Sequence, residues 1–94
     1  MFVVINDRHG GFCLSKEALE NYCEIKGILD TDSFSHHFID RCDSTLVNIV
    51  RSMGDRANDR YSRLKIVEIP DGIEYFIQEY DGMEWIAESH RTWR

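Results

Sequence analysis

The dipeptide Asp81-Gly82 constrains the fold more than any other feature of this sequence. It lies between two stretches rich in aromatic and β-branched residues, 73–80 and 83–88, and it fits a two-residue type I′ β-turn better than any other dipeptide in the chain. A C-terminal β-hairpin is therefore predicted, and the length of the turn fixes which residues face each other. The predicted cross-strand pairs are Phe76 with Ala87, Ile77 with Ile86, Gln78 with Trp85, and Glu79 with Glu84.

The last of these pairs is unfavourable, because two carboxylates would lie directly opposite each other. Either a longer loop shifts the register, or a cation neutralises the pair, and an arginine, a partner or a metal ion can supply that charge. Successive side chains alternate between the two faces of a strand. One face of the hairpin is expected to carry Phe76, Gln78, Tyr80, Met83, Trp85 and Ala87, and the other Tyr75, Ile77, Glu79, Glu84, Ile86 and Glu88.

The start of the chain is predicted to form a strand followed by a helix. The uninterrupted apolar run 2–5 is typical of a strand that is covered on both faces. Ser15 is expected to cap a helix over about 16–26, since its side chain can accept a hydrogen bond from the first helical turn. Gly27 is well suited to end that helix in a left-handed conformation.

A second helix and a further strand are predicted before the hairpin. Asp43 or Ser44 is expected to cap the helix, which stops at Gly54 or continues to about residue 57. A short extended piece over 36–41 and a strand over 64–69 are also predicted. Residues 1–94 then form a single α+β domain in the order β-α-β-α-β-β-β, with a mixed sheet packed on two helices and a C-terminal β-hairpin.

The composition limits the classes of partner. The chain has 17 acidic and 11 basic residues and a formal net charge of -6, which argues against a protein that grips duplex nucleic acid through a broad basic face. The basic residues gather within 51–65 and at the C-terminus, an arrangement that suits a small anionic ligand. Three cysteines without a CxxC pair, and no stretch that resembles a signal peptide or a membrane span, indicate a cytoplasmic protein that does not contact membranes.

The polar segment between the first strand and the first helix is the candidate ligand site. The glycines at Gly10 and Gly11 allow a ligand to approach the backbone, and the start of a helix attracts phosphate. Positive charge for such a site is available from Arg8, His9 and Lys16, with the Ser15 hydroxyl nearby. The spacing matches neither the Walker A loop nor the dinucleotide fingerprint, so the two glycines equally fit a tight connection that needs them for shape alone.

The C-terminal segment 89–94 adds residues that are typical of recognition. Arg91 and Trp93 can stack on planar rings or fasten the chain end to the rest of the protein. Both residues are therefore included in the candidate ligand site.

Three catalytic or metal-binding alternatives are weaker. Zinc can be bound by histidine and cysteine, but the candidates are scattered: His36, His37 and Cys42, with His9 or His90. Nucleophilic catalysis by Cys13 with His9 as its base would need a third group that orients the histidine, and the sequence shows none. The alternating glutamates Glu68, Glu74, Glu79, Glu84 and Glu88 are more typical of a solvated face than of a magnesium site. We therefore predict no metal, no cofactor and no catalytic residue.

Two segments carry a resemblance to a known family. The stretches VVINDRHGGFCLS and LKIVEIPDGIEYFIQEYDGMEWIAESHRTW, with the helix-length segments between them, resemble a widespread family of small accessory proteins of tailed bacteriophages and prophages. The position of Cys13 is commonly glycine in that family, so the loop is expected to be stiffer here. The resemblance implies a small acidic protein that acts by binding in the bacterial host cytoplasm, often against host defence.

In that context two binding functions are expected. In the first, a homo-oligomer sequesters a nucleotide-derived immune signal in a pocket built from Arg8, His9, Gly10, Gly11 and Ser15, with Arg91 and Trp93 closing over it. In the alternative, the protein inhibits a host or defence enzyme by presenting its acidic hairpin and exposed aromatics, namely Glu79, Glu84, Tyr80 and Trp85. A third function, which the sequence favours less, is that of a small metal-dependent hydrolase that uses His9 and a set of glutamates.

Overall fold

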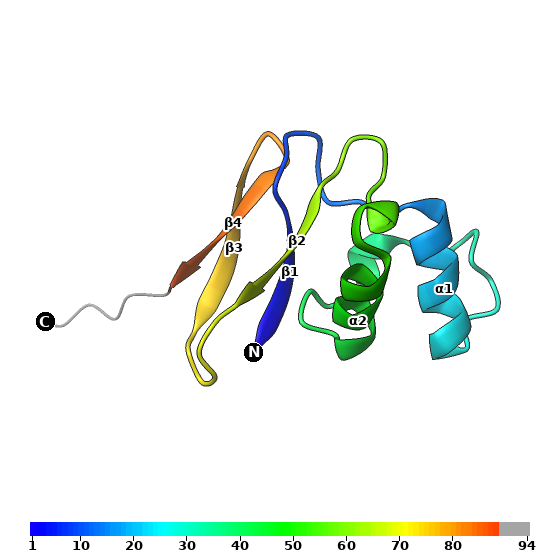
Figure 1. Cartoon of the computed structure of the whole chain (residues 1–94), viewed down its shortest axis with the longest axis horizontal. Helices are drawn as coiled ribbons and strands as arrows, with labels where there is room; N and C mark the ends of the chain where they lie inside the picture. Colours follow the sequence, from blue (N-terminus) through cyan, green and yellow to red (C-terminus); the bar gives the residue numbers. More distant parts are fainter. Residues whose placement is uncertain (89–94) are drawn as a thin grey trace, which may run out of the picture.

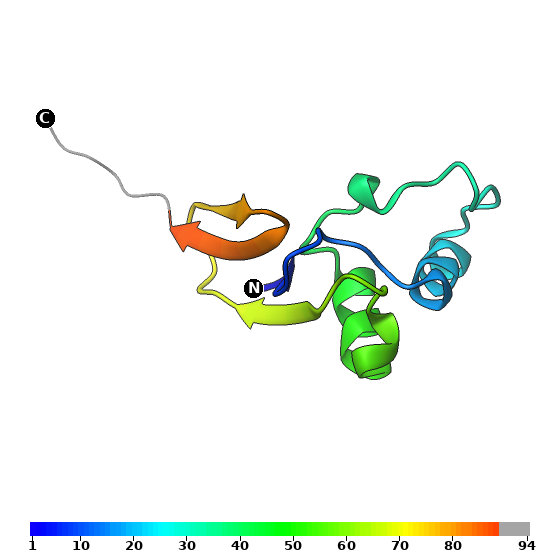
Figure 2. The ribbon, with the colours of Figure 1, turned by 90° about the horizontal axis from the view of Figure 1, so that it is seen from above.

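The computed structural model describes residues 1–88, and a two-stranded antiparallel ladder lies at its centre. The ladder joins β1, Phe2–Asn6, to β2, Leu64–Glu68. Two helices cover one face of this ladder and a second pair of strands covers the other, so the molecule has three layers (Figure 1). The view from above shows the same order, with the central ladder between the helices and the hairpin (Figure 2).

Alternation along the central strands divides their side chains between the two outer layers. Val4, Leu64 and Ile66 pack into the main hydrophobic core with the helices. Val3 and Ile5 are also buried, and they point to the opposite face, which the hairpin covers. The apolar run 2–5 therefore forms a strand covered on both faces, as predicted.

Both helices begin and end as their capping residues predict. Helix α1, Lys16–Lys26, is capped by Ser15, whose Oγ accepts a hydrogen bond from the Ala18 N–H, and it ends at Gly27 with φ +74°. Helix α2, Ser44–Met53, is capped by Asp43 and continues as a short 3-10 helix, η2, Gly54–Ala57.

The C-terminal hairpin has the predicted turn and register. Strands β3, Tyr75–Tyr80, and β4, Met83–Glu88, are joined by Asp81 and Gly82, which both have positive φ angles, +51° and +89°. This is the combination that a type I′ turn requires. All four predicted cross-strand pairs are present, including Glu79 opposite Glu84.

Two details of the predicted fold need correction, although the α+β class and the order of the other elements are confirmed. Residues 36–41 do not form a strand; they begin with a 3-10 helix, η1, His36–Phe38. Ser35 starts this turn by accepting a hydrogen bond from the His37 N–H, and local capping of this kind outweighs a pattern of only two apolar residues. The described strands also form two separate antiparallel pairs rather than one mixed sheet, because side chains fill the space between β1 and β4.

A hydrogen bond from Tyr22 Oη to Asp43 Oδ2, 2.8 Å long, joins the two helices. Burial, followed by this hydrogen bond, raises the pKa of Tyr22 to about 12. Burial also acts to raise the pKa of Asp43, but hydrogen bonds from Tyr22, the Thr45 N–H and Lys26 outweigh it and hold that pKa below its ordinary value. The hydrogen bond between Tyr22 and the ionised Asp43 is therefore most favourable at pH values between the pKa of Asp43 and that of Tyr22.

Replacing Tyr22 with phenylalanine is expected to lower the free energy of unfolding by about 1.5–3 kcal/mol at pH 8, because the hydrogen bond to an ionised group is lost. A phenol whose pKa is raised by folding stabilises the protein below its unfolded value of 10.0, and this contribution is lost as the pH rises toward about 12. The difference between wild type and variant should therefore be about 1 kcal/mol smaller at pH 11 than at pH 8. Urea unfolding at both pH values measures it.

The control for this prediction is Tyr61→Phe, which alters an exposed ring and should change stability by less than about 0.5 kcal/mol. If Tyr22→Phe lowers the free energy of unfolding by the same amount at pH 8 and pH 11, the proposed role of the phenol is contradicted.

Candidate functional site

Three loops converge at the end of the molecule where β1 finishes. They are residues 8–11 after β1, residues 60–63 before β2, and the hairpin turn at residues 80–82; together we call them the three-loop end (Figure 1). The Gly10 N–H donates to the Asp81 carbonyl at 3.1 Å, and the Asp7 N–H donates to the Arg63 carbonyl at 2.8 Å. Backbone hydrogen bonds therefore connect the first loop to the hairpin turn, and the residue directly before the first loop to residues 60–63.

The side chain of Asn6, which is completely buried, holds the three loops in place. Its Nδ2 donates to the carbonyls of Arg8 and Gly82, at 2.6 and 2.8 Å, and its Oδ1 accepts from the Arg63 N–H at 2.8 Å. One amide thus binds all three loops. Asn6 was not predicted as part of the site, although a polar residue that directly follows a buried apolar run is a signal that could have identified it.

Two glycines, Gly10 in the first loop and Gly82 in the hairpin turn, allow close backbone contacts. A Cβ atom on Gly10, with φ +129°, would lie 2.5 Å from the Tyr61 carbonyl oxygen. A Cβ atom on Gly82 would lie 2.1 Å from the Gly11 nitrogen. A side chain at either position would collide with backbone atoms of another loop. The close packing of these loops therefore requires glycine at both positions.

The surface of the three-loop end carries guanidinium groups beside exposed rings. Arg8 Nη1 lies 3.5 Å from the Arg60 carbonyl, and the Arg60 guanidinium lies 5.7 Å from the centre of the Tyr61 ring. Within residues 1–88, neither Arg8 nor Arg60 forms an ion pair with a carboxylate. Arg63, in contrast, donates to the Asp7 carbonyl at 2.9 Å and lies 3.6 Å from its carboxylate.

Two tyrosines supply most of the exposed ring surface. Tyr61 is 59% exposed and Tyr80 is 71% exposed. The ring of His9 contacts Tyr80 edge to face, with the ring centres 6.2 Å apart. The predicted ligand site contained only Arg8, His9, Gly10 and Gly11 of this surface. The other members are far from residue 10 in the sequence; they are Arg60, Tyr61 and Tyr80.

The other predicted ligand-site residues lie elsewhere. Ser15 Oγ donates to the Arg56 carbonyl and the Ser15 N–H donates to the Ala57 carbonyl, so the start of α1 packs against η2. Lys16 lies beside an acidic surface that includes Glu17 and Glu20. The structure does not gather these residues with the glycines, because the intervening side chains of Phe12 and Leu14 are anchored in the core. Arg91 and Trp93 lie outside the described residues.

The predicted clash between Glu79 and Glu84 is resolved by an arginine. Arg41 Nη1 and Nη2 donate to the two carboxylate oxygens of Glu84, at 2.6 and 2.8 Å, and the Arg41 guanidinium stacks 3.6 Å from the centre of the Phe12 ring. Glu84 also accepts from the Asn6 N–H and is only 9% exposed, whereas Glu79 is exposed and accepts from the Gly82 N–H. Of the residues in the partner-binding alternative, Glu84 is thus internal while Glu79, Tyr80 and Trp85 lie on the surface.

The histidine and cysteine candidates are not brought together as a metal site. Cys13 Sγ lies 3.9 Å from Nδ1 of His36 rather than near His9, and Cys42 Sγ donates to Asp40 at 3.1 Å. Burial and the nearby Asp59 raise the pKa of the Cys13 thiol, while burial and the neighbouring cations lower the pKa of His36. Across residues 1–88, no group of three or more histidine, cysteine or carboxylate side chains is close enough to bind a metal ion.

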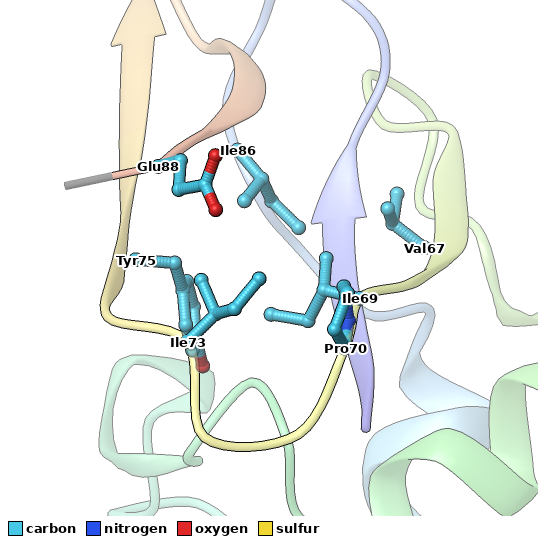
Figure 3. Close-up of a pocket in the computed structure, with 7 residues that line it drawn as sticks. All are labelled: Val67, Ile69, Pro70, Ile73, Tyr75, Ile86 and Glu88. Carbon is cyan, nitrogen blue, oxygen red and sulfur yellow. The ribbon is translucent and has the colours of Figure 1, made fainter. Parts of the chain in front are cut away.

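An apolar hollow of about 360 Å³ lies between the β2–β3 connection and the inner face of the hairpin. Figure 3 shows Ile69, Ile73 and Ile86 pointing toward the same space. Within residues 1–88, the one charged group of its lining is the carboxylate of Glu88. The described lining of the hollow is mainly apolar, whereas the three-loop end carries guanidinium groups beside exposed rings, so the three-loop end is the candidate site for an anionic ligand.

The chain matches no known protein family, no curated protein and no solved structure. None of the helices within residues 1–88 has the length and apolar character needed to cross a membrane.

Proposed function

We propose that this protein binds a small anionic ligand of the nucleotide class at the three-loop end. The observation that carries the proposal is that the three loops present two guanidinium groups and two exposed rings together. The Arg60 guanidinium lies 5.7 Å from the centre of the Tyr61 ring, and Arg8 Nη1 lies 3.5 Å from the Arg60 carbonyl. The exposed ring of Tyr80 lies at the hairpin turn. Arginine recognises phosphate through charge-assisted hydrogen bonds, and aromatic side chains stack on nucleobases. The two kinds of group lie on adjacent loops, as a ligand with a phosphate and a base requires.

The framework beneath these side chains supports the proposal. The Asn6 hydrogen bonds fix the three loops before any ligand arrives, so binding would not have to order the backbone. Preorganisation of this kind reduces the entropic cost of binding. The site is an open surface rather than a deep pocket, and a homo-oligomer that joins two such ends would enclose the ligand more completely.

The biological role that we propose is sequestration of a nucleotide-derived immune signal by a phage or prophage protein. It is supported by the resemblance to phage accessory proteins. Sequestration needs tight binding without turnover, whereas a small metal-dependent hydrolase, the third of the expected functions, would convert the ligand to a product in a reaction that a chelator stops. Incubating the protein with each ligand, with and without chelator, and assaying product separates the two.

A thermal-shift scan against cyclic mononucleotides, cyclic dinucleotides and ADP-ribose derivatives tests the binding function. A ligand present at a hundred times its dissociation constant adds about 2.7 kcal/mol to the stability of the folded state. For a protein of this size that corresponds to a rise in Tm of several degrees, on the order of 10 °C. The variants Arg8→Gln and Arg60→Gln are expected to abolish the rise that one ligand class gives, because each removes a phosphate donor.

The matched control is Arg51→Gln, which removes the same charge from an arginine on α2 that lies over the Phe2 ring. This variant should keep the full ligand-induced rise. A flat response of the wild type across the panel, or an equal rise in Arg60→Gln and wild type, would contradict the proposal.

A further inference from the structure

The hairpin presents an aromatic surface to solvent on the face that points away from the central ladder. Phe76 and Trp85 lie on this face and remain 46% and 44% exposed. Trp85 Nε1 donates to the side chain of its cross-strand partner Gln78 at 2.9 Å, which holds the indole ring in one orientation. We call Phe76, Gln78 and Trp85 the outer hairpin face. It is separate from the three-loop end, and Tyr80 lies at the boundary between the two surfaces.

The strand at the edge of this face is also unpaired. Strand β4 is the one that contacts β1, so β3 is the outer strand of the hairpin (Figure 2). Among the described strands, β3 is hydrogen-bonded to β4 alone. An edge of this kind can accept a further extended segment through backbone hydrogen bonds.

The charge of this region indicates which chemistry would bind. Residues 66–88 contain seven carboxylates and no lysine, arginine or histidine. Within residues 1–88, only two of the seven form ion pairs: Glu84 with Arg41, and Asp71 with the amino terminus. Of the remaining carboxylates, Glu74 lies directly before β3 and Asp81 lies in the hairpin turn, whereas Glu79 and Glu88 belong to the opposite face of the hairpin.

We propose that the outer hairpin face binds an extended, arginine-containing segment of another protein. The arginine guanidinium groups would stack on Trp85 and Phe76, since cations are attracted to the faces of aromatic rings. The carboxylates of Glu74 and Asp81, at the two ends of β3, would complement the charge of the segment. The hairpins of two copies of this chain carry the same negative charge, which disfavours pairing of one hairpin with the other.

The test is calorimetric titration of the protein with a short peptide that alternates arginine and valine. Saturable binding is expected, and Trp85→Ala and Phe76→Ala should each weaken it by about tenfold. Leu29→Ala is the control for an exposed apolar side chain elsewhere, since Leu29 is almost fully exposed, and it should leave the affinity unchanged. Circular dichroism and the Tm establish that each variant is folded.

A pair of charge reversals separates local recognition from general attraction to an acidic protein. Glu74→Lys, next to β3, should weaken binding severalfold, whereas Glu20→Lys, which makes the same change in net charge on α1, should not. The proposal is overturned by equal weakening in these two variants, by unchanged affinity in Trp85→Ala, or by equal binding of a peptide that alternates glutamate and valine. Absence of saturable binding, or a concentration-dependent dimer that Trp85→Ala dissociates, also overturns it.

Discussion

Replacing Arg41 with alanine is expected to destabilise the fold by about 3–5 kcal/mol, because it leaves the Glu84 carboxylate buried without its counter-charge. The same substitution removes the hydrogen bond from Arg41 to the Val4 carbonyl and the stacking on Phe12. A domain of this size has a total stability on the order of 5–10 kcal/mol, so most of it would be lost. Urea unfolding of the variant at neutral pH measures the effect.

Two further variants test whether the stability lost in Arg41→Ala comes from the unpaired charge of Glu84. Arg56→Ala breaks an exposed ion pair with Glu17, 3.9 Å long, and should cost less than about 0.5 kcal/mol. The double variant Arg41→Met with Glu84→Gln should recover part of the stability, since no buried charge is left unpaired. An Arg41→Ala cost no larger than that of Arg56→Ala would show that the pair does not hold the hairpin to β1.

The second large effect is expected for Gly82→Ala, with a cost of about 2–5 kcal/mol. The positive φ of this residue disfavours alanine by about 1–2 kcal/mol. The added Cβ would also lie 2.1 Å from the Gly11 nitrogen and 2.6 Å from the Gly10 nitrogen, so backbone must move, at a further cost of about 1–3 kcal/mol. Urea unfolding gives the cost, and hydrogen exchange of the hairpin amides reports whether the turn separates from the first loop.

Gly72→Ala is the control that measures the cost of a positive φ angle without a collision of the added Cβ. Gly72 has a similar φ of +81°, but no described atom lies within 4 Å of the position of its Cβ. Its cost should therefore be only about 1–2 kcal/mol. Equal costs for Gly72→Ala and Gly82→Ala would contradict a tight contact between the turn and residues 10–11.

The local structure of this chain could be predicted because it depends on residues close together in sequence. Asp81-Gly82 fixes the turn, since a type I′ turn requires positive φ at both central residues, and the register then follows from counting. Ser15 and Asp43 cap their helices through side-chain oxygens within the first turn. The predicted strand over 36–41 was wrong because two apolar residues carry little information beside the capping chemistry of Ser35.

The long-range features could be anticipated only in part. The pairing of Glu79 with Glu84 indicated that a cation is needed, and arginine was among the expected sources, but no local pattern selects Arg41, which lies 43 residues from Glu84. The burial of Asn6 depends on three loops that meet only in the folded chain.

The candidate site was predicted from one loop, whereas the folded surface is built from three. Arg8, His9, Gly10 and Gly11 were found because glycines and cations are adjacent in sequence. Ser15 was included for the same reason, but the anchored side chains between it and the glycines take the chain to another part of the molecule. Arg60 and Tyr61 were missed because sequence distance hides their approach to residue 10.

An NMR titration tests the proposed ligand site most directly. The ¹H–¹⁵N spectrum of the protein is recorded while the nucleotide that gives the largest thermal shift is added. The amide signals of residues 8–11, 60–63 and 80–82 are expected to move together and to saturate, while those of α1 stay in place. Shifts centred on α1 or another distant element, with the signals of the three-loop end unchanged, would contradict the account.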